Sequence, residues 1–368
     1  MKILSSRERV TRAFERRDQD RAPRHESFWP ETIRRWMEEG LPGSDPGAAE
    51  EQALALLGSD LYSCCWCWPH PLGNRQEVIA EDHETRVVKD GSGGIARWWK
   101  GRSGTPEHIG FDCDSRDKWE EIYRPALAAQ PVCLDVPGAV ARCVAGRSRG
   151  SWTYLAGIEA FESLRKILGD EQFLFATLDD PEWVADIAEA ATDAVLRDLD
   201  AVIEAADAAG ARPDGVWIYG DMAFKTMTFC SPAAYRALIW PQHRRMADWA
   251  HERGMRFIYH TDGDVRAVVP MYIEAGFDCL QPLEAKASMD LRDLAPKYGD
   301  AIAFFGNLDV MKLIGNDLDE IEAEIAVKTA AGMATRGYLC HSDHSIPPQI
   351  SFATWKRMIS LIDRYTTY

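Results

Sequence analysis

Short runs rich in strand-forming residues alternate with helical stretches along almost the whole chain, and this alternation limits the fold more than any other feature. "PEWVADIAEAATDAVLRDLDAVIEAADAAG" is typical of the helical stretches. Strands that alternate with helices predict a parallel sheet, and eight such units favour a closed (β/α)8 TIM barrel. The eight runs are "PRHESF", "DLYSCCW", "GSWTYLA", "GVWIYGD", "MRFIYHTDGD", "FDCLQPLE", "AIAFFGNLD" and "GYLCHSDHS".

One stretch, from about residue 76 to 119, interrupts this alternation. "QEVIAEDHETRVVKDGSGGIARWWK" reads as two strands joined by a Gly-rich turn, which predicts an antiparallel β-hairpin inserted after the second barrel strand. No Pro/Ser-rich linker and no internal repeat divides the chain. We therefore expect a single α/β domain over residues 1–368.

Charge and composition exclude several classes of partner. Lys and Arg total 42 against 58 Asp and Glu, which argues against nucleic acid and anionic membrane surfaces. No run reaches the roughly 20 apolar residues of a membrane helix, and the charged start is not a secretory signal. The nine cysteines are scattered rather than spaced as a framework, which indicates reduced thiols in a cytoplasmic protein.

Polar residues mark the ends of the predicted strands. In a (β/α)8 barrel the carboxyl ends of all strands meet on one face, and that face carries the active site. Asp60 opens the second run, whereas the other polar residues end later ones. The sequence thus predicts one cluster, formed by Asp60, Asp221, His260, Asp262, Glu284, Asn307, Cys340, Asp343 and His344.

Three members of this cluster are candidate metal ligands. His260, Asp262 and His344 offer two imidazoles and a carboxylate, which suffice for zinc with an open position or for non-haem iron. Cys340 or Glu284 could supply or replace a ligand. Because no local motif such as His-Glu-x-x-His supports the set, a metal site and a metal-free polar pocket are about equally supported by the residues alone.

The segment "CCWCWPH" contains three cysteines that are too close together for the usual C-x2-4-C zinc grip. Thiols and tryptophans in such a run more often fill a core or a pocket wall. Trp66 and Trp68 are therefore candidates for an aromatic wall that faces a substrate.

Several longer segments of the chain carry a family resemblance. They are "SSRERVTRAFERRDQDRAPRHESF", "GSWTYLAGIEAFESLRKILGDEQFLFATLDDPEWV", "GDMAFKTMTFCSPAAYRALIWPQHRRMADWAHERGMRFIYHTDGD", "GFDCLQPLE", "FFGNLD" and "GYLCHSDHSIPP". Together they resemble the uroporphyrinogen decarboxylase superfamily, and most closely its cobalamin-dependent methyltransferase branch. The resemblance implies a cytoplasmic TIM-barrel enzyme that acts on a small molecule, often as a homodimer.

The methyltransferase branch holds zinc with a His-x-Cys pair after the fifth strand and a Cys after the eighth, and the metal activates a thiolate. His260 matches the first ligand, but Asp262 stands in place of the first cysteine. His344 stands in place of the second, judged from the following "SIPP". This harder ligand set suits an oxygen nucleophile or leaving group as well as a thiolate.

The decarboxylase branch of the superfamily fits less well. Asp60 and His344 match its substrate-binding aspartate and histidine, but "RHESFWPET" occupies the place of an early arginine pair. Gly157 lies about where that branch carries a tyrosine. A polycarboxylate substrate would lack paired cationic donors.

Together the residues and the resemblance predict a zinc-dependent methyltransferase or demethylase that moves a methyl group between a corrinoid (cobalamin) and a small molecule. A separate corrinoid protein would be its partner. Glu284 would be a fourth ligand or general base, Asp343 would orient a ligand, and Asp60, Asp221 and Asn307 would contact substrate; each role competes with plain structural hydrogen bonding. The alternatives are a metal-free decarboxylase or lyase for a small carboxylic substrate, and a non-catalytic relative that binds a cobamide or a metal.

Overall fold

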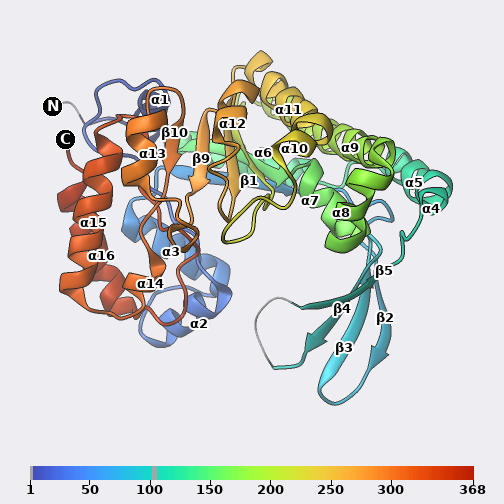
Figure 1. Ribbon diagram of the computed structural model, residues 1–368. Helices are drawn as coiled ribbons and strands as arrows, with labels where there is room; N and C mark the ends of the chain where they lie inside the picture. Colours follow the sequence, from blue (N-terminus) through green and yellow to red (C-terminus); the bar gives the residue numbers. More distant parts are fainter. Residues whose placement is uncertain (1–2, 102–105) are drawn as a thin grey trace.

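The computed structural model describes residues 3–101 and 106–368, and it shows an α/β fold built around a curled parallel sheet (Figure 1). Seven of the eight predicted runs form its strands, in the order β1-β6-β7-β8-β9-β10-β11. Every residue of β6 is buried, as expected for a parallel strand covered on both faces. The strands are β1 (Leu61–Cys67), β6 (Trp152–Ile158), β7 (Gly215–Tyr219), β8 (Arg256–Thr261), β9 (Cys279–Pro282), β10 (Ala303–Phe305) and β11 (Tyr338–Leu339).

The first predicted run, residues 23–28, lies between the two edge strands of this sheet. The backbone N–H of His25 donates to the carbonyl of Cys340, just after β11. On the other side, the N–H of Asp60, just before β1, donates to the carbonyl of Arg24. The segment thus connects both edges without forming a regular strand, and the arrangement is consistent with a TIM-like fold.

The stretch after β1 is larger than the single hairpin that the sequence predicts. It contains a four-stranded antiparallel sheet that projects away from the parallel sheet (Figure 1). The last strand, "EHIGF", is short and largely exposed, so it lacks the alternation by which a strand is recognised. Residues 102–105 of the stretch lie outside the described residues. The strands are β2 (Gln76–Glu81), β3 (Thr85–Asp90), β4 (Gly94–Trp99) and β5 (Glu107–Phe111).

Helices pack around the parallel sheet, and the longest of them, α9, shows why they form. Asp180 caps it by accepting a hydrogen bond from the N–H of Trp183, and Pro181 follows at the first helical position. No helix of the described part is long and apolar enough to cross a membrane. The longer helices are α1 (Ser6–Phe14), α2 (Pro30–Glu38), α3 (Pro46–Leu57), α6 (Val136–Ser148), α7 (Ala160–Leu168), α8 (Asp170–Asp179), α9 (Pro181–Ala208), α11 (Trp240–Glu252), α13 (Leu291–Tyr298), α15 (Leu318–Met333) and α16 (Phe352–Tyr365).

Shorter helical segments complete the connections between these elements. They are α4 (Arg116–Lys118), a π-helical segment η1 (Trp119–Tyr123), α5 (Arg124–Ala129), α10 (Pro232–Leu238), α12 (Val269–Ala275), a 3-10 segment η2 (Ala285–Ala287) and α14 (Val310–Leu313).

Helix α1 closes the amino-terminal end of the parallel sheet. Ser5 and Glu8 form a capping box at its start. Its residues Val10 and Phe14 join one buried cluster with Leu61 at the start of β1 and with side chains of the other strands. The amino end of the sheet is therefore filled by apolar side chains, which leaves its carboxyl end for a site.

Candidate active site

A cavity of about 780 Å³ opens at the carboxyl ends of the parallel strands. Its size lies in the range of small-molecule sites. A larger groove of about 900 Å³ lies between α9 and α11, but Arg–Asp pairs such as Arg253 with Asp200 line it, so it is a solvated helix surface. The cavity lining includes His25, Glu26, Trp29, Trp66, Arg142, Tyr154, Trp217, Tyr219, Asp221, His260, Asp262, Gln281, His341 and His344.

Three neighbouring strands place Tyr219, His260 and Gln281 in one row. Tyr219 pairs in register with His260, and His260 pairs with Gln281. The Tyr219 ring stacks on the imidazole, with ring centroids 4.7 Å apart, and Nδ1 of His260 hydrogen-bonds Oε1 of Gln281. Because that amide oxygen can only accept, Nδ1 carries the proton and Nε2 keeps its lone pair.

Asp221 and Asp262 follow β7 and β8 and face this row. The N–H of Asp262 donates to Oδ1 of Asp221 at 3.0 Å, and Nε2 of His260 lies 3.6 Å from the same oxygen. One ligand atom from each of the three side chains lies within 4.8 Å of the other two. The structure thus joins His260 and Asp262, two predicted ligands, with Asp221, which the sequence predicts as a substrate contact.

Asp262 is an unusual carboxylate. Burial raises its pKa to about 6, the charges of Asp221 and Glu284 add to the rise, and His260 opposes it. Its Oδ1 atom is buried and has no hydrogen-bond partner. A buried acceptor without a donor is costly, and a bound cation would satisfy it. Two carboxylates and an imidazole are donors that suit zinc.

A second polar group in the cavity wall, Glu26 with His341, is not predicted from the sequence. The two carboxylate oxygens of Glu26 accept hydrogen bonds from the hydroxyl and the N–H of Ser342, and Oε1 lies 3.2 Å from Nε2 of His341. Burial raises the pKa of Glu26 to about 8 and lowers that of His341 to about 4. Nδ1 of His341 donates to the carbonyl of Ser342, so a protonated Glu26 can donate to Nε2.

His25 lies beside this pair. Burial, with a smaller effect of His341, lowers the pKa of His25 to about 3, and its Nδ1 lies 2.7 Å from the hydroxyl of Ser59. The ring packs edge-on against Trp217 of β7. Polar residues within the runs "PRHESF" and "GYLCHSDHS" are the only sequence signal for this wall.

Asp60 does not lie with the other predicted residues. It precedes β1 and therefore sits at the amino end of the sheet, away from the cavity. Its fully buried carboxylate accepts hydrogen bonds from Arg9 at 2.6 Å, from Arg21 at 2.6 Å and from the N–H of Arg24 at 2.9 Å. These partners occupy both oxygens, so Asp60 anchors the surrounding segments in this structure and lies outside the cavity lining.

Asn307 and Cys340 also lie outside the cavity lining. Oδ1 of the fully buried Asn307 accepts from Nζ of Lys328 at 2.7 Å, and its Nδ2 donates to the carbonyl of Met289 at 2.8 Å. Both polar atoms of its side-chain amide are thus hydrogen-bonded to other groups of the protein. Burial raises the pKa of Cys340 to about 12, and its thiol is not among the donor atoms near His260.

Glu284 and Asp343 hold the loops behind the cavity. Oε2 of Glu284 accepts from the N–H of Gly263 at 2.8 Å, next to Asp262, and Oε1 lies 2.8 Å from Nζ of Lys286. Asp343 accepts from the N–H groups of Ala285 and Val310, each at 2.9 Å. Burial raises its pKa to about 6. Neither carboxylate is in the cavity lining.

The remaining predicted residues divide between the cavity and its surroundings. His344 lines the cavity and stacks on Trp29, with centroids 5.7 Å apart, but it is outside the donor group around His260. Trp66 also lines the cavity, 6.1 Å from Tyr219. Trp68 stacks on His70 instead and is not part of the lining.

A protein-family model described as uroporphyrinogen decarboxylase (URO-D) matches residues 155–365. The chain belongs to the uroporphyrinogen decarboxylase family. The matched part of this family member contains Asp221, His260 and Asp262. A comparison with curated proteins found no match.

Among solved structures, this URO-D family member is similar to a methyltransferase from Methanosarcina mazei. The TM-score is 0.69 at 15% identity, and the alignment covers 98% of this chain and 99% of the other. A D-psicose 3-epimerase matches with a TM-score of 0.35 at 12% identity over 63% of this chain and 84% of the other. The first similarity shows a shared fold over the whole chain.

Proposed function

We propose that this protein is a zinc-dependent methyltransferase or demethylase that moves a methyl group between a corrinoid and a small molecule. One observation carries the proposal: donor atoms of Asp221, His260 and Asp262 lie within 4.8 Å of one another at the mouth of a cavity, and one of these carboxylates has an unpartnered buried oxygen. The fold shared with a methyltransferase supports it. The protein would act as one domain, a closed barrel with residues 23–28 as its first strand.

Asp221, His260 and Asp262 would hold the metal. When bound, zinc would supply a Lewis acid that lowers the pKa of an oxygen or sulfur nucleophile or assists the departure of a demethylated oxygen. Two carboxylates in place of thiolates leave more positive charge on the metal, which favours an oxygen nucleophile such as an alcohol or phenol. This ligand set differs from the predicted one because Asp221 takes the place given to His344.

Other residues of the chain would position these ligands and the substrate. Gln281 and Tyr219 hold the imidazole of His260 so that Nε2 faces Asp221. Glu284 fixes the loop that carries Asp262 through the N–H of Gly263 and is a positioning residue. His344 and Trp66, which both line the cavity, would contact the substrate.

The pair of Glu26 and His341 is suited to hold or move a proton. At neutral pH Glu26 keeps its proton, since its pKa is about 8, and His341 is neutral. A protonated carboxyl beside a neutral imidazole can pass a proton to a departing group or accept one from an incoming nucleophile. Both side chains reach the cavity wall.

The metal-free decarboxylase is the weaker candidate. Arg142 is the one Arg or Lys among the described residues that line the cavity, and its Nε already donates to the carbonyl of Ser63 at 2.9 Å. A substrate with several carboxylates needs paired cationic donors when it is buried. The cavity therefore favours a substrate with little negative charge.

Metal analysis and a methyl-transfer assay test the proposal. Protein purified without chelators is expected to contain about one equivalent of zinc at the His260 site. With methylcobalamin and a thiol, alcohol or phenol, each turnover would transfer CH3 to the acceptor, release its proton and leave cob(I)alamin, which is followed by its absorbance under anaerobic conditions. A full set of acceptors without methylated product, or activity that is unchanged after complete metal removal, would contradict the proposal.

Matched variants locate the site. His260→Ala and Asp262→Asn are expected to lose the zinc of this site and at least 100-fold in activity, because each removes a ligand. Asp309→Asn, which changes an acid after β10 outside the cavity lining, is the control and should retain both. If His260→Ala retains the full amount of zinc at this site, His260 is not a ligand.

A further inference from the structure

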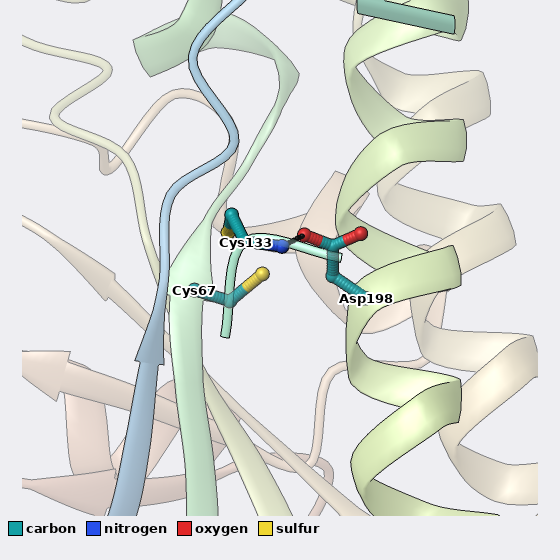
Figure 2. A group of neighbouring side chains, drawn as sticks. All are labelled: Cys67, Cys133 and Asp198. Carbon is teal, nitrogen blue, oxygen red and sulfur yellow. Dashed lines mark hydrogen bonds between the residues drawn. The ribbon is translucent and has the colours of Figure 1, made fainter. Parts of the chain in front are cut away.

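A second group of metal-binding side chains lies away from the cavity, at the base of the inserted sheet. The Sγ atoms of Cys67 and Cys133 and a carboxylate oxygen of Asp198 lie within 4.8 Å of one another. Figure 2 shows the Cys67 sulfur and the Asp198 carboxylate directed toward each other, with Cys133 beside them. The three residues come from the end of β1, from the segment between α5 and α6, and from α9.

The position of the two cysteines along the chain is informative. Cys67 is the last residue of β1, just before the chain leaves for the four-stranded sheet. Cys133 follows α5, where the chain has returned from that sheet and is about to enter α6. The two thiols therefore mark the two sides of the neck of the insertion, and Asp198 belongs to the helix against which this neck packs.

The donors have the burial and charge that a structural metal requires. Cys67 and Asp198 are fully buried, whereas Cys133 is only partly buried and leaves a path for entry. The Asp198 carboxylate accepts from the N–H of Cys133 at 2.8 Å and from Nε of Arg197 at 2.8 Å. Each of its oxygens keeps a further lone pair.

We propose that Cys67, Cys133 and Asp198 bind a zinc ion that fastens the neck of the inserted sheet to α9. Tetrahedral zinc with Zn–S bonds of about 2.3 Å needs sulfurs about 3.8 Å apart, which the observed spacing allows. Two thiolates and a carboxylate exceed the charge of Zn²⁺ by one, and the Arg197 guanidinium balances it. Water completes the coordination on the side of Cys133.

A neighbouring thiol pair provides an internal comparison. Cys64, on the same strand, hydrogen-bonds the thiol of Cys143 in α6. No His, Asp or Glu of the described residues joins this pair within the distance that brings Asp198 to Cys67. Cys143 is therefore a matched control: a buried cysteine beside β1 that has a thiol partner but no carboxylate.

Cobalt substitution separates this site from the one in the cavity. Asp221, His260 and Asp262 contain no sulfur, so a thiolate-to-cobalt charge-transfer band can arise only from cysteine ligands. Full-length protein is stripped with a chelator, kept reduced with a phosphine and titrated with Co²⁺. We expect this band in the wild type, where the cavity site can take a second equivalent of Co²⁺, and in His260→Ala, where the band saturates at one equivalent. Failure of the cavity site therefore leaves this test unaffected.

Single substitutions identify which residues bind the metal at this second site. Cys67→Ser and Cys133→Ser are expected to lose at least nine-tenths of the band, Cys143→Ser to keep it, and Asp198→Asn to weaken Co²⁺ binding at least tenfold. A wild type without the band overturns the proposal whether or not any variant folds. So does a band that survives both Cys67→Ser and Cys133→Ser, or one that Cys143→Ser abolishes.

Discussion

Asp60 and Asp262 lie next to opposite ends of parallel strands, the first fully buried and the second half-buried, and their surroundings are opposite. Arginine side chains and a backbone N–H surround Asp60 at the amino end of β1. Asp262, after β8, has an unpartnered oxygen and a pKa that burial raises to about 6. The carboxylate at the amino end of the sheet is fully paired with other protein groups. The carboxylate at the carboxyl end is not, and such groups often occur at sites for ligands.

Among the variants that test this difference, neutralising Asp60 is expected to have the largest effect on stability. Asp60→Asn removes the buried counter-charge of Arg21 and leaves Arg9 paired with Asp20 alone. Loss of one partner of a buried ion pair typically costs about 3 to 5 kcal/mol. We expect a fall of this size in the free energy of unfolding, measured by urea denaturation. The control is Glu31→Gln, which removes an exposed pair with Arg34 and should change stability by less than about 0.5 kcal/mol.

The pH dependence of stability provides a second test through Glu26, because burial also disfavours the charged form of this carboxyl group. Its folded pKa is about 8 against an ordinary 4.5, so the folded state binds a proton that the unfolded state has lost. The free energy of unfolding should therefore fall as pH rises from about 4.5 to 8, by at most about 1.4 kcal/mol per pH unit.

Glu26→Gln should remove the contribution of Glu26 to the pH dependence of the free energy of unfolding. Between pH 5.5 and 8.5 we expect the stability of the wild type relative to Glu26→Gln to drop by about 3 kcal/mol. His25 and His341 are present in both proteins, so their titration cancels in the difference. Parallel stability curves for the two proteins would show that Glu26 is ionised in the folded state.

Asp262→Asn should have the opposite sign to Asp60→Asn. Since the folded pKa of Asp262 is raised, its charge costs stability above pH 6 when no metal is present. In chelator-treated protein at pH 7.5 we expect a gain of about 1 to 2 kcal/mol from urea unfolding curves. A loss of more than 1 kcal/mol would place Asp262 with Asp60 as a structural carboxylate.

The smallest expected effect separates His344 from the ligands. His344 stacks on Trp29 and lies outside the donor group, so His344→Ala should weaken zinc binding at the cavity site by less than about tenfold, that is about 1.4 kcal/mol. His260→Ala should abolish it. Competition with a zinc chelator measures both constants, and equal losses in the two variants would restore His344 as a ligand.

Much of the framework could be predicted from the sequence, because it depends on local pattern. Apolar runs alternating with helices located seven parallel strands, and convergence of their carboxyl ends brought His260, Asp262 and Asp221 together. Asp60 was misplaced because it precedes its strand and so belongs to the opposite end. Trp68 was misplaced because alternation no longer applies beyond Cys67, where β1 ends.

What could not be predicted depends on contacts between distant segments. Glu26 meets Ser342 across 316 residues, and neither carries a recognisable motif. The roles given to Asn307 and Glu284 were undecidable from sequence, since a polar residue after a strand can face the cavity or hold a loop. The sequence predicts two strands in the insertion, whereas the structure has four, and β5 becomes evident only through its pairing with β4.

Part of the cavity wall comes from a different region of the chain than the proposed ligands. The family match over residues 155–365 includes the three proposed ligands, whereas His25, Trp29 and Trp66 of the wall precede it. Substitutions in the first part of the chain can therefore change which molecule is accepted without moving an atom that would bind metal. This division identifies residues 25–29 and Trp66 as the place to alter selectivity by design.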